Sequence, residues 1–209
     1  LAHPGDRTYR IAMEDLPEPP HRADRVGSPP PPPERVPRPG LDGATLYLRD
    51  AGQYVLVRDD PNTPAKILDG YDGRQSWRVR RGRLAEIKDG LGAGGIPMPT
   101  ILADVPFCDL HRTLDRIRTD YTIEQSDLAP LDASQRPLLH VLARRNSRLV
   151  RGPETIEIWA NASTGMPRRI VFDRAKLQGN RHAVRLTFDL ADEAPLPADW
   201  FTPGPHVSP

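Results

Sequence analysis

The stretch GLGAGGIPMPTILADVPFCDLHRTLDRIRTDY, residues 90–121, decides how the rest of this sequence is interpreted. Its apolar side chains recur at steps of three and four residues, the period of one face of an α-helix: Phe107, Leu110, Leu114, Ile117 and Tyr121. Asp104 is in position to cap the first turn, and Arg116 and Arg118 lie near the negative end of the helix dipole. We therefore predict a helix over residues 104–119, and a single striped helix has to pack against a sheet.

Short alternating segments that are typical of β-strands lie on both sides of the predicted helix. In residues 182–190, for example, Val184, Leu186 and Phe188 alternate with polar side chains. We predict about ten strands, at residues 7–16, 43–50, 53–60, 75–81, 84–88, 121–125, 137–145, 154–162, 168–175 and 182–190. Most are joined by short turns, so the pairing is expected to be antiparallel.

One helix among so many strands is too few for alternating β-α-β units. We therefore predict a mainly β single domain over residues 1–209, with a strongly curved antiparallel sheet, or an incompletely closed β-barrel, covered by the helix. Its successive parts are strand hairpins at 43–88, a glycine loop and lid helix at 90–121, and C-terminal strands at 121–202. Residues 61–73 are interpreted as turns, because Asp69 and Asp72 each precede a glycine.

A proline-rich segment, residues 17–40, interrupts the chain after the first strand. It holds ten prolines, five of them in a run, and almost no apolar bulk. Such a composition favours an extended polyproline II conformation over a strand. We interpret it as a long surface loop, and the alternative is a ligand for a proline-recognising groove of a protein partner.

Composition narrows the function classes. Of the 209 residues 37% are hydrophobic and 27% charged, which is typical of a globular protein, and the formal net charge of +1 gives no general attraction to nucleic acid. The single cysteine, Cys108, excludes an internal disulfide framework and a cysteine-based zinc cluster. No apolar run is long enough for a transmembrane helix.

The sequence contains no recognisable catalytic motif. The histidines are scattered, no serine lies in a nucleophile elbow, and the glycines at 90–95 lack the lysine of a phosphate-binding loop. We therefore expect no enzyme activity, no cofactor and no metal. Arginines cluster at residues 78–83 and 144–151, which we interpret as solvated faces rather than as an anion site.

The order of four short motifs resembles the LolA/LolB-like superfamily, which includes lipoprotein carriers and the regulator RseB. The motifs are a glycine-led hairpin strand at 43–49, a DG-x-x-x-W turn and strand at 72–77, Y-x-I after the helix at 121–123, and I-x-I-W-x-x-x-x-T-G-x-P-x-x-I-x-F-D at 156–173. The resemblance covers about residues 43–202 and implies a curved, incompletely closed antiparallel barrel with an apolar concavity covered by helices. The chain departs from the pattern in its proline-rich insert and in beginning almost at a strand.

The resemblance and the helix stripe lead to one functional expectation and one alternative. We expect an exported binding module, periplasmic or otherwise extracytoplasmic, that holds a lipid, acyl chain or lipidated peptide in its concavity. The alternative is a sensory or protein-interaction domain of a membrane-anchored regulator with a filled core. The predicted ligand-binding residues are Leu46, Leu48, Leu56, Trp77, Val79, Phe107, Leu110, Leu114, Ile117, Ile158, Phe172, Leu186 and Phe188.

Overall fold

A computed structural model of the chain describes residues 5–16, 41–49, 53–60, 63–90, 117–129, 137–147, 153–162, 166–177 and 180–208. The proline-rich segment and most of the predicted lid helix, with Phe107, Leu110 and Leu114, lie outside these residues. The end of that helix is described: residues 117–120 are helical, and both Ile117 and Tyr121 are buried.

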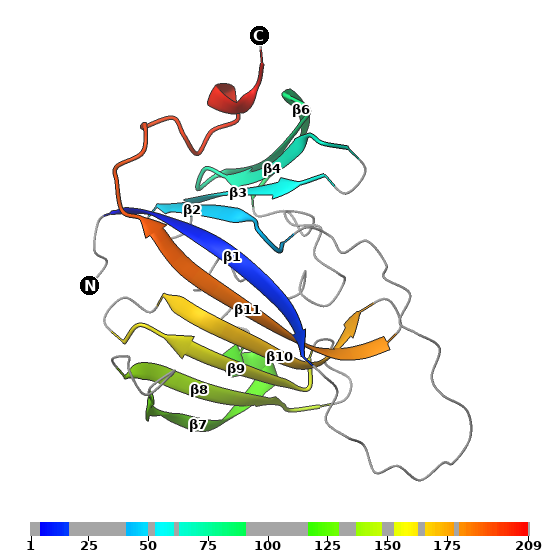
Figure 1. Ribbon diagram of the computed structural model, residues 1–209, viewed down its shortest axis with the longest axis vertical. Coiled ribbons are helices and arrows are strands. Elements are labelled where there is room, and N and C mark those ends of the chain that lie inside the picture. The colour runs from blue at the N-terminus through cyan, green and yellow to red at the C-terminus, as the bar shows by residue number, and fades with distance from the viewer. Residues whose placement is uncertain are drawn as a thin grey trace.

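The described residues form one antiparallel sheet of eleven strands (Figure 1). The strands are β1 (Asp6–Leu16), β2 (Thr45–Arg49), β3 (Gln53–Asp59), β4 (Lys66–Tyr71), β5 (Gln75–Arg80), β6 (Arg83–Asp89), β7 (Tyr121–Ala129), β8 (Leu138–Arg145), β9 (Thr155–Ala160), β10 (Pro167–Leu177) and β11 (Asn180–Asp192). A short 3-10 helix, η1 (Gly204–His206), follows β11. Because β6 and β7 are the two ends of the strand order and do not pair with each other, the sheet is open. The predicted mainly β, curved and incompletely closed architecture is confirmed.

The first strand joins two meanders into this single sheet. The strand order is β6-β5-β4-β3-β2-β1-β11-β10-β9-β8-β7, so β1 lies between β2 and the last strand, β11. Tyr9 pairs with Leu46 on one side, and Ile11 pairs with Phe188 on the other. In Figure 1, β1 and β11 accordingly run side by side across the middle of the molecule. All other neighbours in the sheet are also neighbours in sequence, as expected of hairpins.

The prediction of turns throughout residues 61–73 is wrong for residues 66–71. These residues form β4, which pairs with both β3 and β5, whereas residues 63–65 and 72–74 lie in bends or turns on either side of it. Within β4, Gly70 lies opposite Trp77, and a side chain at Gly70 would place its Cβ 2.2 Å from the indole ring. Gly70 is therefore a strand residue that makes room for Trp77, a role that the dipeptide Asp69-Gly70 does not indicate.

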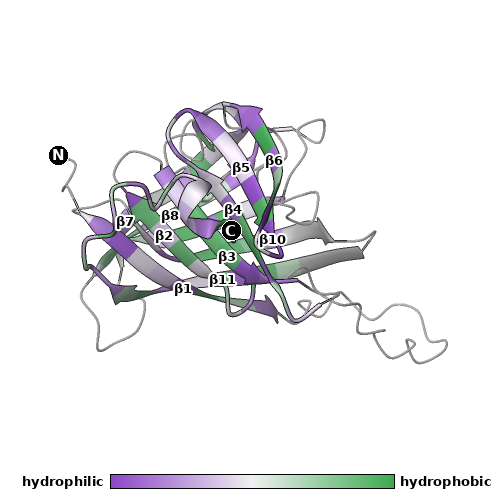
Figure 2. Ribbon diagram, turned by 90° about the horizontal axis from the view of Figure 1, so that it is seen from above, coloured by the Kyte–Doolittle hydropathy of each residue, from purple (hydrophilic) through white to green (hydrophobic). Residues whose placement is uncertain are grey.

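The larger hydrophobic core lies on one face of the sheet, which we call the inner face. It combines side chains of β1, β2, β3 and β8–β11 with Ile117 of the helical residues 117–120 and Tyr121 at the start of β7. The alternation of hydrophobic and polar residues along the strands follows from this burial (Figure 2). The last strand shows it most clearly, since Val184, Leu186 and Phe188 are buried and the residues between them are not.

A smaller core lies on the opposite face, which we call the outer face. It contains Val55, Trp77 and Val79 from the strands and Phe201 from the segment after β11. Figure 1 shows that this C-terminal segment, drawn in red, returns to the half of the sheet that contains β3, β4 and β6. The central strands of this half therefore bury side chains on both faces.

Substitution of Gly70 tests the close approach of Trp77. We expect Gly70→Ala to lower the free energy of unfolding by roughly 1–3 kcal/mol, because the added methyl group overpacks the contact. Urea denaturation measures this change. Gly5→Ala is the control, since no atom lies within 4 Å of its added Cβ, and an equal effect of the two substitutions would contradict the interpretation.

Candidate interaction surface

The inner face bears most of the predicted ligand-binding residues, and these are packed together. Seven of them belong to the inner core and Leu48 packs against it: Leu46, Leu56, Ile117, Ile158, Phe172, Leu186 and Phe188. All seven are at most 7% exposed, and Leu56, Phe172 and Leu186 have no exposed surface at all. A side chain without accessible surface leaves no space for a water molecule beside it. In the described residues, the inner face is therefore a filled core rather than an open cavity.

Trp77 and Val79 are separated from the other predicted ligand-binding residues. Val79 pairs with Leu68 and Trp77 with Gly70, on the outer face, where both are buried in the smaller core. The sequence analysis expected all thirteen residues to line one concavity, and the structure corrects this placement. Whether any of them contacts a ligand stays a prediction.

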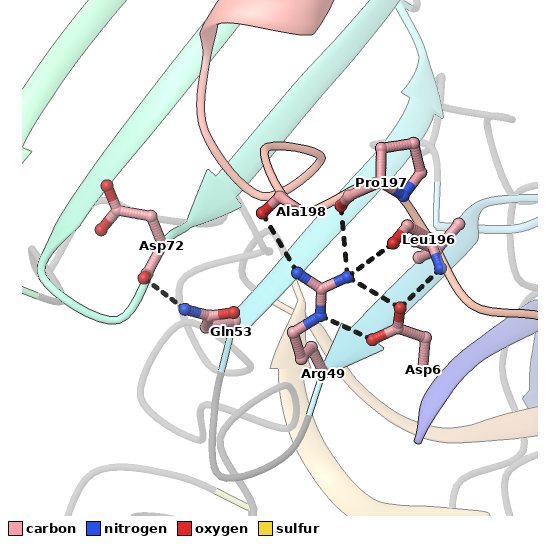
Figure 3. A network of polar contacts seen from close by, with 7 residues as sticks. All are labelled: Asp6, Arg49, Gln53, Asp72, Leu196, Pro197 and Ala198. Carbon is pink, nitrogen blue, oxygen red and sulfur yellow. Dashed lines mark hydrogen bonds and ion pairs between the residues drawn. The ribbon is translucent and has the colours of Figure 1, made fainter. Parts of the chain in front are cut away.

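The C-terminal segment, which covers the outer face, is held in place by Arg49 at the end of β2 (Figure 3). Its guanidinium group donates to both carboxylate oxygens of Asp6, at 2.7 and 2.8 Å. It also donates to the main-chain carbonyls of residues 196–198, at 2.9–3.2 Å, and the amide of Leu196 donates to Asp6 at 2.6 Å. We call this set of contacts the clasp, because it ties the first strand, β2 and the C-terminal segment to one another.

The environment of Asp6 in the clasp stabilises its carboxylate. The hydrogen bonds from Arg49 lower the pKa of Asp6 below its ordinary value, burial partly opposes this, and the amide of Leu196 adds to the lowering. Since the pKa of Asp6 is lower in the folded state than in the unfolded state, its contribution to stability is present above the unfolded pKa. That contribution is lost as the pH falls through the folded pKa.

Beyond the clasp, the C-terminal segment is bound by Trp77. The indole nitrogen of Trp77 donates to the carbonyl of Phe201 at 2.8 Å, and the ring of His206 stacks on the indole with centroids 5.2 Å apart. The guanidinium of Arg49 lies 4.6 Å from the centre of the Phe201 ring. Finally, the amide of Ser208 donates to the carbonyl of Gly82 at 2.8 Å, so the segment is attached along its length.

Two arginines of the first predicted cluster, Arg78 and Arg80, pair with buried carboxylates. Arg80, Arg81 and Arg83 are exposed, as expected of a solvated face. Asp69 accepts hydrogen bonds from Arg58 at 3.0 Å and from Arg78 at 2.5 Å, and it is fully buried. Arg80 pairs in the same way with the buried Asp60. Burial raises the pKa of Asp69, against the opposing effect of the two guanidinium groups. These carboxylates join β3, β4 and β5, which is a structural role.

His140 lies in a polar cluster on the outer face of the other half of the sheet. Its ring stacks on Trp159 with centroids 4.6 Å apart, and its Nε2 lies 2.8 Å from a carboxylate oxygen of Glu157. Arg169 lies over the same Trp159 ring at 5.8 Å. The described residues contain no group of three or more potential metal ligands, and none of their helices is long and apolar enough to cross a membrane.

In the half of the sheet that contains β3–β6, the most exposed element is the edge strand β6. Six of its seven residues are exposed, and Leu84 and Ile87 expose 43% and 47% of their surface. Large apolar side chains on the free edge of a sheet are typical of a contact surface, because an edge also offers unpaired main-chain groups. The sequence analysis identified residues 84–88 as a strand. That they form an edge depends on the pairing of the whole sheet.

Comparisons with known proteins give only distant matches. No protein-family model and no curated protein matches the sequence. Among solved structures, the chain is similar to MucB in complex with MucA(peri), with 14% identity and a TM-score of 0.35 over 95% of this chain and 54% of that chain. It is also similar to the Pseudomonas aeruginosa MucA/MucB complex, with 13% identity and a TM-score of 0.36 over 94% and 55%.

A structure of MucB alone matches with 14% identity and a TM-score of 0.35, and covers 95% of this chain and 57% of that chain. The chain thus spans about half the length of the solved structures that it matches. Identity and TM-scores this low assign neither a family nor a function.

Replacing the guanidinium group of Arg49 tests whether the clasp stabilises the fold. We expect Arg49→Lys to lower the free energy of unfolding by about 1–3 kcal/mol, because an ammonium group cannot reach Asp6 and three carbonyls at once. Chemical denaturation monitored by tryptophan fluorescence measures this. Arg144→Lys is the matched control, since the exposed Arg144–Glu124 pair is expected to contribute less than about 1 kcal/mol. Equal losses in both variants would contradict the proposed role of the clasp.

Protonation of Asp6 at acid pH should weaken the clasp. We expect Asp6→Asn to destabilise the protein at pH 7, and the difference from the wild type to shrink as the pH falls below the ordinary aspartate pKa of 3.8, because the wild-type carboxylate is then protonated. Urea denaturation of both proteins between neutral and acid pH measures the difference. A difference that stays constant down to the lowest pH would show that the charge of Asp6 does not stabilise the clasp.

Proposed function

We propose that this chain is a non-catalytic, extracytoplasmic protein-interaction or sensory module whose binding surface lies outside the concavity of its sheet. The observation that carries the proposal is the packing of the inner face: Leu56, Phe172 and Leu186 have 0% exposure, so an acyl chain beside them would have to displace core side chains. A carrier of lipids needs an apolar cavity of several hundred Å³. Leu56, Phe172 and Leu186 expose no surface that could line such a cavity.

The polar side chains support a binding role over a catalytic one. In the described residues Asp6, Asp60 and Asp69 are each held in ion pairs with arginines that connect strands or fix the C-terminal segment. Groups held in this way stabilise the fold and have no free position from which to act on a substrate. The exposed edge strand β6, by contrast, presents Leu84 and Ile87 to the surroundings.

The similarity to MucB is too weak to support this proposal. The proposed binding role is based on the geometry, and the proposed extracytoplasmic location on the resemblance in sequence. Lipid carriage, the expectation from the sequence, has no support from the described residues. The suggested partner contact of the proline-rich segment 17–40 falls outside them.

Native mass spectrometry and photo-crosslinking together test the proposed function. We expect the gently purified chain to have the mass of the protein alone, because its core is already filled. We also expect benzoylphenylalanine at position 87, introduced in the organism of origin, to form an adduct with a protein. The same group at Leu190, which is 41% exposed and away from the edge strand, is the control and should give no such adduct. A lipid that co-purifies consistently, or the absence of any protein adduct at position 87, would overturn the proposal.

A further inference from the structure

The free edge of β6 has the properties of a site for an additional strand. β6 is the terminal strand of the sheet, and its seven residues span roughly 23 Å at 3.3 Å per residue. In an edge strand, every second residue directs its main-chain N–H and C=O groups away from the neighbouring strand. The described part of the chain places no strand on this side of β6.

The register of β6 against β5 determines which side chains a new strand would meet on each face. Leu84 pairs with Val79 and Ile87 pairs with Trp77, so both apolar side chains lie on the outer face. They are three residues apart and still share a face because the pairing is irregular between them, as in a β-bulge. Lys88 pairs with Ser76 and Arg83 pairs with Arg80, which places these two cations on the inner face.

The charges of the β5–β6 hairpin indicate which sign of charge a partner should carry. Residues 75–89 contain five basic and two acidic side chains. The basic Arg78 and Arg80 are paired with aspartates of the sheet, whereas Arg81 and Arg83 extend from the turn and the start of β6. Lys88 is paired with Glu86 of the same strand. The excess positive charge is therefore at Arg81 and Arg83, where a partner with acidic side chains would be attracted and a basic one repelled.

We propose that β6 accepts an extended segment of a partner protein as an additional strand of the sheet. The segment has apolar side chains beside Leu84 and Ile87 on the outer face and an acidic side chain beside Arg83 on the inner face. Main-chain hydrogen bonds supply the affinity, and the alternating side chains supply the specificity. This inference deepens the proposed protein-interaction function and depends on it.

The acidic edge strand β7 of a second copy is the competing occupant. It carries Glu124 and Asp127, which suit the charge of β6. Its exposed apolar residues, Ile123 and Leu128, pair with Ala143 and Leu139 on the inner side of the sheet, however. In a continuous sheet formed by two copies of the same orientation, they would lie on the face opposite Leu84 and Ile87. The register therefore favours a different protein.

Peptide binding to the full chain tests the inference. The probe is a fluorescent nine-residue peptide that alternates valine and glutamate, and the matched peptides have lysine in place of glutamate or proline at the centre. We expect the acidic peptide to bind at least about tenfold more tightly than either control, because lysine is repelled and proline cannot donate to the edge. Its binding should also weaken as the salt concentration rises. Fluorescence anisotropy measures each affinity.

Variants of the edge locate the binding. We expect Ile87→Lys to weaken binding of the acidic peptide by roughly tenfold or more, since an apolar contact is lost. Arg83→Glu should reverse the preference between acidic and basic peptides. Leu190→Lys, at a similarly exposed position outside the edge, should leave the affinity unchanged. Circular dichroism and urea denaturation confirm that the variants remain folded, which is expected at exposed positions.

Several results would overturn the inference. Equal binding of the acidic, basic and proline-containing peptides would exclude strand addition with charge selection, and equal losses in Ile87→Lys and Leu190→Lys would place the site elsewhere. Concentration-dependent self-association that Ile87→Lys abolishes would assign the edge to a second copy. A protein adduct at position 87 without any peptide binding would overturn strand addition alone, whereas a co-purifying lipid would overturn the proposed function itself.

Discussion

The guanidinium group of Arg49 connects parts of the chain that are far apart in sequence. It binds Asp6 at the start of the first strand and three successive carbonyls near the end of the chain. Because the buried carboxylate of Asp6 needs hydrogen-bond donors, and Arg49 also binds the carbonyls of residues 196–198, these contacts specify where the C-terminal segment crosses the sheet. Phe201 then reaches the outer core, and Trp77 binds its carbonyl. The two-sided burial of β3 and β5 depends on this placement.

Burial on both faces explains why the sheet region around β3–β5 has little room for a ligand. On the inner face, core side chains have no accessible surface, and Asp69 holds two arginines. On the outer face, the C-terminal segment covers Trp77 and Val79. In this half of the sheet, the large exposed apolar side chains lie on the edge strand β6, at Leu84 and Ile87. A fold that fills its own concavity in this way presents its strand edge to other molecules.

The polar groups of this region have a structural task. Asp60 and Asp69 are buried carboxylates. Asp69 is paired with arginines of both neighbouring strands, and Asp60, just after β3, is paired with Arg80 of β5. Removing one partner of such a pair leaves an uncompensated charge, which is strongly destabilising. The arginines of β5 thus help to determine the register of β3, β4 and β5, and the excess positive charge of the hairpin remains at the exposed turn and edge.

The sequence by itself determined the fold class, because alternating residues and short turns report on local structure. The strands could be predicted from a period of two, and the hairpins and their antiparallel pairing from the short turns between them.

Only the tertiary structure decided which faces are covered and which strand is an edge. Gly70 and Asp69 looked like a turn because their dipeptide favours one, but the indole of Trp77 requires the glycine and two arginines surround the aspartate. Likewise, Trp77 and Leu56 both looked like lining of one cavity, whereas they lie in different cores. These outcomes depend on contacts between residues distant in sequence, which local periodicity does not contain.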